Sequence, residues 1–343
     1  MPRNGVEKLR KKVTLRDVAT VAEVSMSTAS KALNDRPGEV SASTRDHVRD
    51  VAERLGFTPN AIARAMLSGR TGTVGLLTDD LEGRFSLPIL MGAEDAFGAG
   101  QTSVLLCDAR GDAIREQHHV RALMGRNVDG LIVVGSRPDP RPSWAGRVSV
   151  PVVHAYAPSQ DAADLSVVTD NRRAGELAAE HLLSVGRRRI AHISGDQTYM
   201  AAQGRAEGVR AVLEAEGLEL VAPPQFGAWT ERWGRAATQT LLAERPDVDA
   251  IVGGSDQISR GILDALHDEG RRVPVDVALV SFDNWKPLIV DAPTPLTSVD
   301  LGFTSIGRRA AEMLSSVLDG RPPEESVEYV QPRLVVRESS AGS

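Results

Sequence analysis

Apolar residues recur at helical spacing in three short segments near the beginning of the chain, which predicts three helices. The first helix follows Thr14, an N-cap residue with an aspartate three positions later, close to the spacing of a capping box. Ser25 can cap the second helix, which is expected to end near Asn34, and the third runs from Ser41 to Gly56. The positions that face inward are Leu15, Val18, Ala19 and Ala22, then Ala29, Ala32 and Leu33, and finally Val48, Val51, Ala52 and Leu55.

The second predicted helix carries many small hydroxyl residues, in the stretch VSMSTASKALN at positions 24–34. The predicted order is a helix, a tight turn at Glu23 and Val24, a second helix and a supporting helix. This is the helix-turn-helix arrangement, in which the second helix enters the major groove of DNA. Small side chains let such a helix approach the duplex closely, although a small amphipathic bundle with a solvated face is an alternative. We expect phosphate contacts from Ser25, Thr28 and Ser30, and base contacts from Met26, Ser27 and Lys31.

A further short helix is predicted after Gly56, where the sequence reads FTPNAIARAMLSGRTGTVGLL. Pro59 and Asn60 mark its start, residues 61–67 form an apolar helical stretch, and SGRTG is a flexible exit. A helix of about two turns is marginal in water, because nucleation is costly and fewer than roughly 12 residues rarely compensate for it. We therefore expect this helix to form only against a partner.

From about Thr71 onward, apolar runs typical of strands alternate with helical runs. The predicted strands are TVGLLTDD, TSVLLCDA, VDGLIVVG, VPVVHAY, RRIAHISG, DAIVGGSD and VALVSFDN, separated by helical runs such as RAGELAAEHLLSVG, GVRAVLEAEG and SRGILDALHDEG. Continuous apolar strands with intervening helices indicate parallel sheets that are covered on both faces. There are too many strands for one compact sheet, so we expect two doubly wound lobes, with a ligand cleft at the carboxyl ends of their strands.

The charge of the chain is unevenly distributed. Residues 1–70 carry a net charge of +5, whereas the remainder carries −11, which gives −6 for all 343 residues. A basic segment on an acidic body suits a protein that must approach a polyanion such as DNA. No apolar run reaches the roughly 18 residues of a membrane span, and the first residues lack the apolar core of a secretion signal, so the sequence predicts a cytoplasmic protein. The lone Cys107 can form no internal disulfide and is expected to be a buried spectator.

The sequence gives little support for catalysis, a metal or a cofactor. It contains no G-x-x-x-x-G-K-[ST] phosphate loop, no G-x-G-x-x-G after a strand and no G-x-S-x-G elbow. The histidines lack metal-ligand spacing, and the adjacent His118 and His119 would point in different directions from a helix. Acidic residues that follow strands could act as general bases, but they more often cap helices or bind ligand hydroxyls; they are Asp79, Asp80, Asp108, Asp170, Asp256 and Asp283. We expect neither an enzyme nor a bound metal or cofactor.

The N-terminal segments also resemble a known family. VTLRDVATVAEVSMSTASKALND and VSASTRDHVRDVAERLGFTPNAIARAMLSGRTGTVGLL are similar to the head and hinge of the lactose repressor (LacI/GalR-type) family of bacterial transcriptional regulators. The resemblance implies a paired hinge helix in the minor groove, with Met66 as an apolar wedge between base steps. It also implies mild strain at Glu23, where the family usually has glycine, and a missing phosphate contact at Phe57. The expected DNA-binding residues are Thr14, Ser25, Met26, Ser27, Thr28, Ser30, Lys31, Asn34, Asn60, Ala63, Arg64 and Met66.

The resemblance extends through the body, in GLLTDDLEGRFSLPILMGAEDAF, TDNRRAGELAAEHLLSVGRRRIAHISG, GGSDQISRGILDALHDEGRRVPVDVALVSFDN and PLTSVDLGFTSIGRRAAEMLSSVLDG. It implies a two-lobed effector domain that shares its architecture with periplasmic sugar-binding proteins. By position, Arg205 and Asp283 would hold ligand hydroxyls or ring nitrogens, and Phe85 and Trp229 would supply apolar faces. The expected effector-binding residues are Phe85, Tyr156, Asp170, Arg205, Trp229, Ser255, Asp256 and Asp283, of which Tyr156 and Ser255 differ from the residues usual in the family.

Together these features predict an α/β protein in three parts. They are an all-α helix-turn-helix head (1–58), a hinge helix and linker (59–71), and a body of two doubly wound parallel-sheet lobes (72–343) that resembles periplasmic binding proteins. The expected function is sequence-specific DNA-binding regulation, with repression as the usual outcome in the family. A homodimer would bind a pseudo-palindromic operator in double-stranded DNA, and a small molecule, expected to be a sugar, would bind between the lobes. The alternatives are a sugar-binding protein without a DNA role and a two-lobed α/β enzyme.

Overall fold

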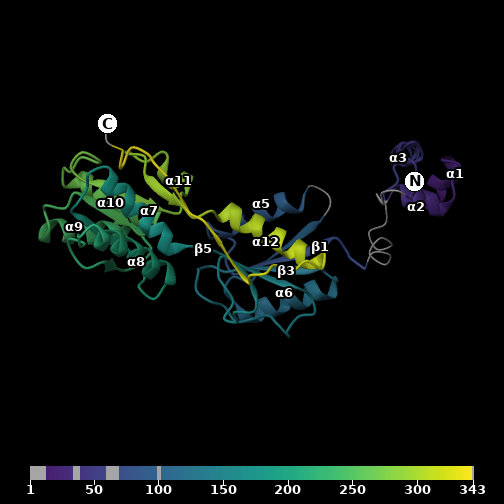
Figure 1. Ribbon diagram of the computed structural model, residues 1–343, viewed down its shortest axis with the longest axis horizontal. Coiled ribbons are helices and arrows are strands. Elements are labelled where there is room, and N and C mark those ends of the chain that lie inside the picture. The colour runs from purple at the N-terminus through teal and green to yellow at the C-terminus, as the bar shows by residue number, and fades with distance from the viewer. Residues whose placement is uncertain (1–12, 34–38, 59–68, 99–101, 342–343) are drawn as a thin grey trace, which may run out of the picture. The chain divides into compact units, whose positions relative to one another are not determined.

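The computed structural model describes residues 13–33, 39–58, 69–98 and 102–341. The chain divides into two compact units, Met1–Thr71 and Gly72–Ser343 (Figure 1). The predicted hinge helix at residues 61–67 lies outside the described ranges. So do five of the predicted DNA-binding residues, which are Asn34, Asn60, Ala63, Arg64 and Met66.

Three short helices form the N-terminal unit: α1 (Leu15–Val21), α2 (Met26–Leu33) and α3 (Ala42–Leu55). Helix α1 begins with the predicted capping box, in which the Thr14 N–H donates to Asp17 Oδ2 at 2.8 Å and the Asp17 N–H donates to Thr14 Oγ1 at 3.4 Å. Ser41 caps α3, which ends at Gly56 with a φ of 65° in the left-handed region. The predicted caps of both helices are therefore confirmed.

The three helices share a core of alanine, valine and leucine side chains. Its buried members are Val18, Ala19, Ala22, Ala29, Ala32, Val48, Val51 and Ala52, and the side chains packed against them include Leu15, Leu33 and Leu55. All the inward-facing positions predicted from helical spacing belong to this set. Small side chains let the helices approach closely, so even this short unit can exclude water from its centre.

The turn between α1 and α2 contains a strained residue. The Val24 N–H donates to the Ala19 carbonyl at 3.0 Å, which closes the turn. Glu23 lies between these helices with a φ of 54°, in the left-handed region. A residue with a Cβ costs about 1 kcal/mol there relative to glycine. The strain that the family resemblance implies is therefore present in the backbone.

Lobe 1 of the second unit is built on a parallel sheet with the strand order β11-β5-β4-β3-β1-β2. Helices α5 and α12 pack on one face of this sheet, and α6 packs on the other. The strands are β1 (Thr73–Thr78), β2 (Ser103–Asp108), β3 (Gly130–Val134), β4 (Val152–Ala155), β5 (Leu165–Thr169) and β11 (Val327–Val330), and the helices are α5 (Ser86–Phe97), α6 (Ala113–Gly125) and α12 (Phe303–Leu318).

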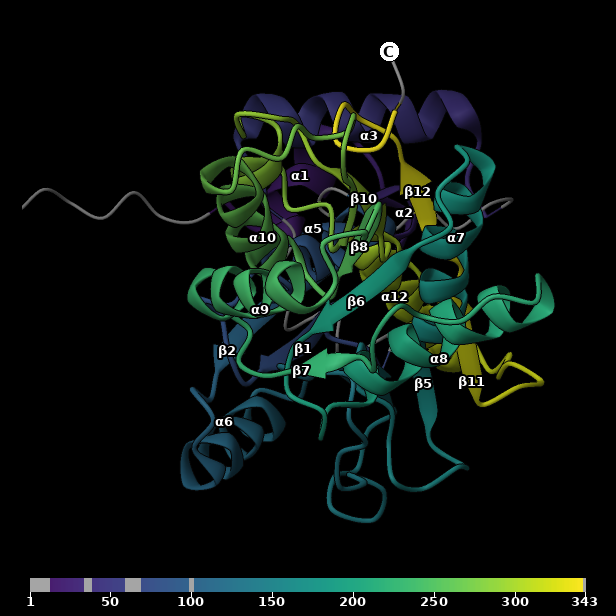
Figure 2. The same cartoon turned by 90° about the vertical axis from the view of Figure 1, so that its left-hand side faces the viewer.

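Lobe 2 contains a sheet with the order β12-β10-β9-β8-β6-β7, in which only β12 is antiparallel to its neighbour. Helices α7 and α8 lie on one face, and α9 and α10 lie on the other (Figure 2). The strands are β6 (Ile190–Ser194), β7 (Gln225–Phe226), β8 (Ala250–Gly253), β9 (Ala278–Phe282), β10 (Thr297–Asp300) and β12 (Arg333–Val335), and the helices are α7 (Asn171–Ser184), α8 (Met200–Ala215), α9 (Glu231–Glu244), α10 (Asp256–Asp268) and α11 (Lys286–Ile289).

The seven strands predicted from apolar runs are all present, as β1, β2, β3, β4, β6, β8 and β9, so the predicted two-lobed architecture is confirmed. The structure adds β5, β7, β10, β11 and β12. Three of these, β7, β11 and β12, lie at sheet edges and are only partly buried, so they lack the continuous apolar pattern of a central strand.

Successive residues of the central strands pack against helices on opposite faces of the sheet. In β1, Leu76 belongs to the cluster beneath α5 and α12, whereas Leu77 belongs to the cluster beneath α6. In β8, Ala250 packs toward α7 and α8, and Ile251 packs toward α9 and α10. Because both faces of each sheet are covered, consecutive residues are apolar, which explains the unbroken runs in the sequence.

Reciprocal glycines hold three helix pairs in close contact. A Cβ on Gly92 of α5 would collide with the backbone of α12, and a Cβ on Gly307 of α12 would collide with the backbone of α5. The same reciprocity joins α7 to α8 and α9 to α10, through Gly175 and Gly208 and through Gly234 and Gly261. The backbones of the two helices in each pair are therefore in direct contact at these glycines. This contact fixes how one helix is placed along the other.

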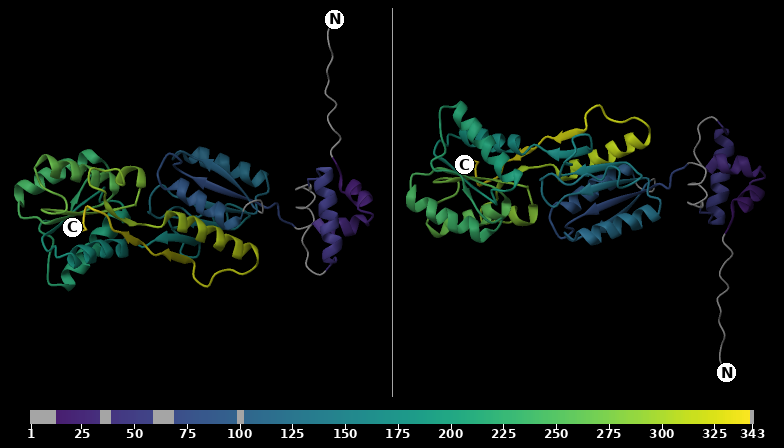
Figure 3. Two further views of the ribbon diagram at one scale, coloured as in Figure 1. Left: turned by 90° about the horizontal axis from the view of Figure 1, so that it is seen from above. Right: turned by 90° about the horizontal axis from the view of Figure 1, so that it is seen from below.

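The chain crosses between the lobes of the second unit three times. It enters lobe 2 between β5 and α7, returns to lobe 1 between β10 and α12, and enters lobe 2 again between β11 and β12. The second and third crossings belong to the yellow segments that run from one lobe to the other in Figure 3. A few short connections of this kind allow two rigid lobes to open and close about a hinge.

We predict that Glu23→Gly stabilises the N-terminal unit by about 0.5–1 kcal/mol, because glycine adopts a positive φ without a steric penalty. Hydrogen–deuterium exchange of the full-length protein, read on peptides from α1 and α3, measures the change. The same substitution at Glu53, which is exposed within α3, is the control and should destabilise the unit by about 1 kcal/mol. Faster exchange in the Glu23 variant would contradict the strain that we assign to this turn.

Candidate functional site

Helix α2 presents a hydroxyl-rich surface on the N-terminal unit. The Thr28 N–H donates to Ser25 Oγ at 3.0 Å, so Ser25 caps the helix as predicted. The opposite side of α2 is held in the core by Ala29 and Ala32. The predicted contact residues lie away from that core, since Ser25, Met26, Ser27 and Lys31 are exposed and Thr28 and Ser30 are half-buried.

Lys31 forms a surface ion pair. Its Nζ lies 3.2 Å from Glu39 Oε2, and the two side chains are 46% and 37% exposed. A pair with this exposure contributes roughly 0–1 kcal/mol, so a phosphate or a guanine can replace the glutamate at little cost. Thr14 is also exposed, and its hydroxyl donates to Asp17 Oδ2 at 2.7 Å within the capping box.

A cavity of about 310 Å³ lies between the lobes of the second unit, and we call it the aromatic cavity. Segments that follow β1, β3, β4 and β9 line it, which is the edge where parallel sheets bind ligands. The predicted effector-binding residues in its lining are Phe85, Tyr156, Arg205, Trp229 and Asp283. The remaining lining residues are Glu82, Gly83, Arg84, Ser136, Arg137, Pro138, Tyr199, Ala201, Gln257 and Trp285.

Arg205 is fixed by the closely packed helices α7 and α8. A Cβ on Gly175 of α7 would collide with the backbone of Arg205, so only glycine permits this approach. The guanidinium donates from Nε to Asn171 Oδ1 at 3.1 Å and from Nη1 to the Gly254 carbonyl at 2.5 Å. Its Nη2 lies 3.6 Å from Asp283 Oδ1, and the residue is only 2% exposed. The Arg205 guanidinium therefore has one fixed orientation at the cavity.

Asp283 lies on a strained turn directly after β9. It has a φ of 99°, and the next residue, Asn284, has a φ of 53°. The turn is held because the Asp283 N–H donates to the Val299 carbonyl at 2.9 Å and the Asn284 N–H donates to Ser298 Oγ at 3.0 Å. Backbone strain of this kind persists where the surrounding structure enforces it, and it is concentrated at binding and catalytic sites. Here it directs a carboxylate that is 5% exposed into the cavity.

Aromatic rings form two walls of the cavity. In lobe 1, Phe85 and Tyr156 pack together with ring centroids 5.0 Å apart, and Phe303 lies against both. In lobe 2, Trp229 packs against Tyr199 with centroids 5.7 Å apart. Burial raises the pKa of the Tyr156 hydroxyl, which stays protonated and able to donate. Rings with polar tips suit ligands that have both apolar faces and hydroxyls.

Three polar contacts join the lobes around this cavity. Arg84 of lobe 1 places Nη2 2.8 Å from Asp283 Oδ2 of lobe 2. The Arg137 guanidinium lies 4.9 Å from the ring centroid of Tyr199. In addition, Asp139 Oδ1 accepts from the Met200 N–H at 3.3 Å. The lobes are therefore joined through charged side chains of the cavity itself, rather than only through the three chain crossings.

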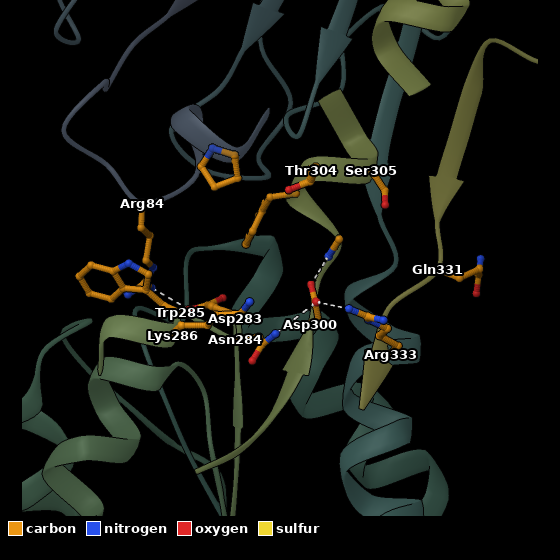
Figure 4. Close-up of a pocket in the computed structure, with 13 residues that line it drawn as sticks. Arg84, Asp283, Asn284, Trp285, Lys286, Asp300, Thr304, Ser305, Gln331 and Arg333 are labelled. Carbon is orange, nitrogen blue, oxygen red and sulfur yellow. Dashed lines mark hydrogen bonds and ion pairs between the residues drawn. The ribbon is translucent and has the colours of Figure 1, made fainter. Parts of the chain in front are cut away.

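A second cavity, of about 570 Å³, shares Arg84, Asp283 and Trp285 with the aromatic cavity and is named the crossing cavity. Figure 4 shows Arg84 reaching from lobe 1 toward Asp283, and Asp300 joined to both Asn284 and Arg333. The rest of its lining is Pro88, Asn284, Lys286, Asp300, Gly302, Phe303, Thr304, Ser305, Gln331 and Arg333. Asp283 is the one predicted effector-binding residue in this lining, whereas the lining of the aromatic cavity contains five of them.

Three of the predicted effector-binding residues lie outside the lining of the aromatic cavity. Asp170 caps α7 by accepting from the Arg173 N–H at 2.8 Å, and Ser255 caps α10 by accepting from the Ile258 N–H at 3.3 Å. Asp256 is fully buried. The sequence does not separate these roles from ligand binding, because both place an acidic or hydroxyl residue directly after a strand.

Asp256 instead holds the segment that carries Trp285. Its Oδ2 accepts from the Trp285 N–H at 2.6 Å, and its Oδ1 accepts from Ser281 Oγ at 2.6 Å and Ser298 Oγ at 2.8 Å. Burial, and then the nearby charge of Asp283, raise the pKa of Asp256 to about 7, although the three hydrogen bonds favour the ionised form. Its carboxyl is therefore partly neutral near physiological pH.

Several polar and aromatic residues that line the cavity were not predicted from the sequence: Glu82, Arg84, Arg137, Tyr199, Gln257 and Trp285. Some adjoin predicted residues, since Arg84 precedes Phe85 and Gln257 follows Asp256. Including the sequence neighbours of each predicted residue would have found Arg84 and Gln257. Arg137 and Tyr199 belong to loops without a distinguishing pattern, and only the approach of the two lobes brings them together.

Comparison with known proteins supports both the helix-turn-helix unit and the two-lobed body. Residues 14–60 match the family described as bacterial regulatory proteins, lacI family, and residues 179–340 match a periplasmic binding protein-like domain. The chain is 33% identical to the HTH-type transcriptional regulator CelR of Thermobifida fusca over 342 residues, covering 96% of this chain and 99% of that protein. The chain belongs to the lacI family. It is a DNA-binding transcriptional regulator and not an enzyme.

Two solved structures of lacI-family regulators resemble this chain along nearly its whole length. One is a CelR–cellobiose complex, with 32% identity and a TM-score of 0.67, covering 96% of this chain and 100% of that one. The other is a lac repressor dimer bound to operator and the anti-inducer ONPF, with 24% identity and a TM-score of 0.74, covering 97% and 100%. At that identity, the second comparison concerns the fold alone. Within the described ranges, no helix of this lacI-family chain is long and apolar enough to cross a membrane.

The raised pKa of Asp256 predicts how the stability of the body varies with pH. The folded protein keeps this proton up to about pH 7, whereas the unfolded chain loses it near pH 4, so stability falls as the pH rises between these values. In Asp256→Asn, thermal unfolding temperatures should decline less between pH 5 and pH 7.5 than in the unaltered protein. Asp268→Asn, at an exposed position near the end of α10, should retain the original slope. An identical slope in both variants would exclude Asp256 as the titrating group.

Proposed function

We propose that this protein is a homodimeric repressor that binds a pseudo-palindromic operator with an affinity set by a sugar in the aromatic cavity. One observation carries the proposal: a single chain combines the exposed α2 surface with a cavity where Arg205 and Asp283 meet Phe85 and Tyr156. The chain would act as a head (1–58), a hinge (59–71) and a body (72–343), in the bacterial cytoplasm where operator DNA is found.

In this proposal the two heads of a dimer occupy the two half-sites of the operator. Helix α2 enters the major groove, and its hydroxyls and main chain meet phosphates while Met26, Ser27 and Lys31 meet bases. Phosphate contacts supply much of the affinity, so binding should weaken as salt increases.

A sugar fits the chemistry of the aromatic cavity. The rings of Phe85, Tyr156 and Trp229 can contact the apolar faces of a pyranose, while Arg205 and Asp283 can bind its hydroxyls. The related CelR was solved with cellobiose, which supports this class of ligand. A free-standing sugar-binding protein accounts for the cavity but not for the α2 surface, so regulation is the better proposal.

Effector and operator would be linked through lobe closure. A ligand that binds both lobes changes the distance between them, and this movement alters how two hinge segments of a dimer are held. The hinge sequence at residues 61–67 is too short to form a stable helix alone, so a small change in its surroundings decides whether it forms. A coupling of roughly 1–3 kcal/mol changes operator affinity about 5- to 150-fold.

For DNA binding, we predict that Lys31→Ala reduces the discrimination between operator and scrambled DNA. Loss of one good base contact should cost about 1–3 kcal/mol for the preferred site and little for other DNA. Full-length protein is titrated with a palindromic site selected from random DNA and with a scrambled version, at two salt concentrations.

Arg54→Ala is the matched control for this experiment. Arg54 is an exposed cation of the same unit, on α3, and it pairs with Asp50 at 3.0 Å in the way that Lys31 pairs with Glu39. The control should preserve the ratio of the two affinities. If Lys31→Ala preserves the ratio as well, α2 is not the helix that reads bases.

For effector binding, we predict that Trp229→Ala lowers sugar affinity about tenfold or more, because it removes a large ring face from the aromatic cavity. Calorimetric titration with a sugar selected by thermal-shift screening measures the change. Gln331→Ala alters an exposed residue of the crossing cavity alone and should leave the affinity unchanged. The opposite pattern would place the effector in the crossing cavity.

A further inference from the structure

Arg84 is a largely buried cation whose hydrogen-bonding capacity is only partly used. Its side chain is 13% exposed, and Nη2 lies 2.8 Å from Asp283 Oδ2. Nε and Nη1 are buried and have no hydrogen-bond partner among the described residues. The guanidinium lies 5.0 Å from the ring centroid of Phe85 and 5.7 Å from that of Trp285. Both rings hold the two unused donors in place before any ligand arrives.

Unused donors and unused acceptors both lie buried in the aromatic cavity, since neither carboxylate oxygen of Asp283 has a hydrogen-bond partner among the described residues. Trp229 Nε1 is buried and also has no partner in the part of the chain that the structure describes. Asp283, the buried carboxylate of the lining, already faces Arg84 at 2.8 Å and Arg205 at 3.6 Å. A buried donor without an acceptor is costly, and a charged one more so. A ligand that satisfies this cavity therefore offers acceptor oxygens to Arg84 and Trp229 and hydroxyl donors to Asp283.

The charges in the interior of the cavity lead to the same conclusion. Arg84 and Arg205 contribute two positive charges, and Asp283 contributes one negative charge. Asp256, outside the lining, compensates incompletely because burial raises its pKa to about 7. A net positive charge on buried side chains is stabilised by an anion.

The rim of the cavity does not change this balance. Arg137 Nε lies 3.5 Å from Asp139 Oδ2, so the charges of this pair offset each other. Glu82 is exposed to solvent, which screens its charge from the interior.

We propose that the effector is an acidic sugar, whose carboxylate or phosphate group accepts hydrogen bonds from Arg84 while its ring lies against the aromatic residues. This inference rests on the proposed sugar-binding function of the same cavity and specifies the chemical class of the ligand. The unused donors of Arg84 belong to a charged group, and a hydrogen bond from a guanidinium to an anionic oxygen is stronger than one to a neutral hydroxyl. A neutral sugar leaves the positive charge uncompensated.

Matched sugars test this proposal on the full-length protein. Calorimetric titrations compare D-glucose with D-glucuronate and glucose 6-phosphate, and D-galactose with D-galacturonate and galactose 6-phosphate. We expect at least one acidic member to bind about tenfold or more tightly than its neutral counterpart. Binding of a uronate identifies a carboxylate ligand, and binding of a sugar phosphate identifies a phosphate ligand. A neutral sugar that binds as tightly as its acidic counterparts would overturn the proposal.

Substitution of Arg84 identifies the residue that receives the anion. Arg84→Gln should weaken binding of the acidic sugar about 10- to 100-fold more than binding of the neutral sugar, whereas Arg84→Lys should restore part of this difference. Arg333→Gln removes an arginine that lines only the crossing cavity and should have no effect. Thermal unfolding of each variant checks that it is folded.

The outcomes separate this inference from the function on which it rests. If Arg84→Gln weakens neutral and acidic sugars equally, or weakens neither, the acidic-ligand inference is wrong and sugar control of the regulator stands. If no sugar of either kind binds to the unaltered protein, both the inference and the proposed sugar effector fail.

Discussion

The body of this regulator depends on how the charge of Asp283 is compensated. A carboxylate that is 5% exposed has lost nearly all its hydration, so it requires positive partners, and these come from both lobes. Arg205 is locked within lobe 2 by Asn171 and the Gly254 carbonyl. Arg84 reaches across from lobe 1. The same carboxylate therefore joins the lobes and lines the cavity that we propose for the effector, so that in this proposal closure and binding involve one shared group.

Strained backbone conformations occur at sharp turns that follow strands or join helices. Tyr156, Asp283 and Asn284 all have positive φ angles, and they lie directly after strands of the two facing sheets. The penalty of roughly 1–3 kcal/mol for each such residue is offset by packing and by hydrogen bonds such as that from Asn284 to Ser298. At Glu23 the same type of strain forms the turn that leads into α2. These four residues lie beside the two candidate sites, whereas Arg110 and Asn127, which also have positive φ angles, lie in other turns of lobe 1.

The cost of removing a charged partner differs greatly between the two candidate sites. Lys31 is retained on the surface by a weak, solvated ion pair, so the head can exchange this partner for DNA at little cost. The cavity between the lobes contains buried charges, where removal of a partner is expensive. Such an arrangement lets a small ligand exert a large effect on the body, while the head keeps its fold. Three short crossings between the lobes allow the body to respond as two rigid parts.

Much of the architecture was determined by patterns along the chain. Helical spacing and capping residues predicted α1 and α3, because caps act within a few residues of each other, and continuous apolar runs predicted seven strands that are buried on both faces. The edge strands β7, β11 and β12 escaped prediction because they are half-exposed. Likewise, Phe85 and Arg205 could be placed in the cavity by family resemblance, whereas Asp170, Ser255 and Asp256 could not be distinguished from ligand-facing residues. Only the tertiary structure decided that Arg84 meets Asp283, since these residues are far apart in the sequence and approach each other only when two separately folded lobes face one another.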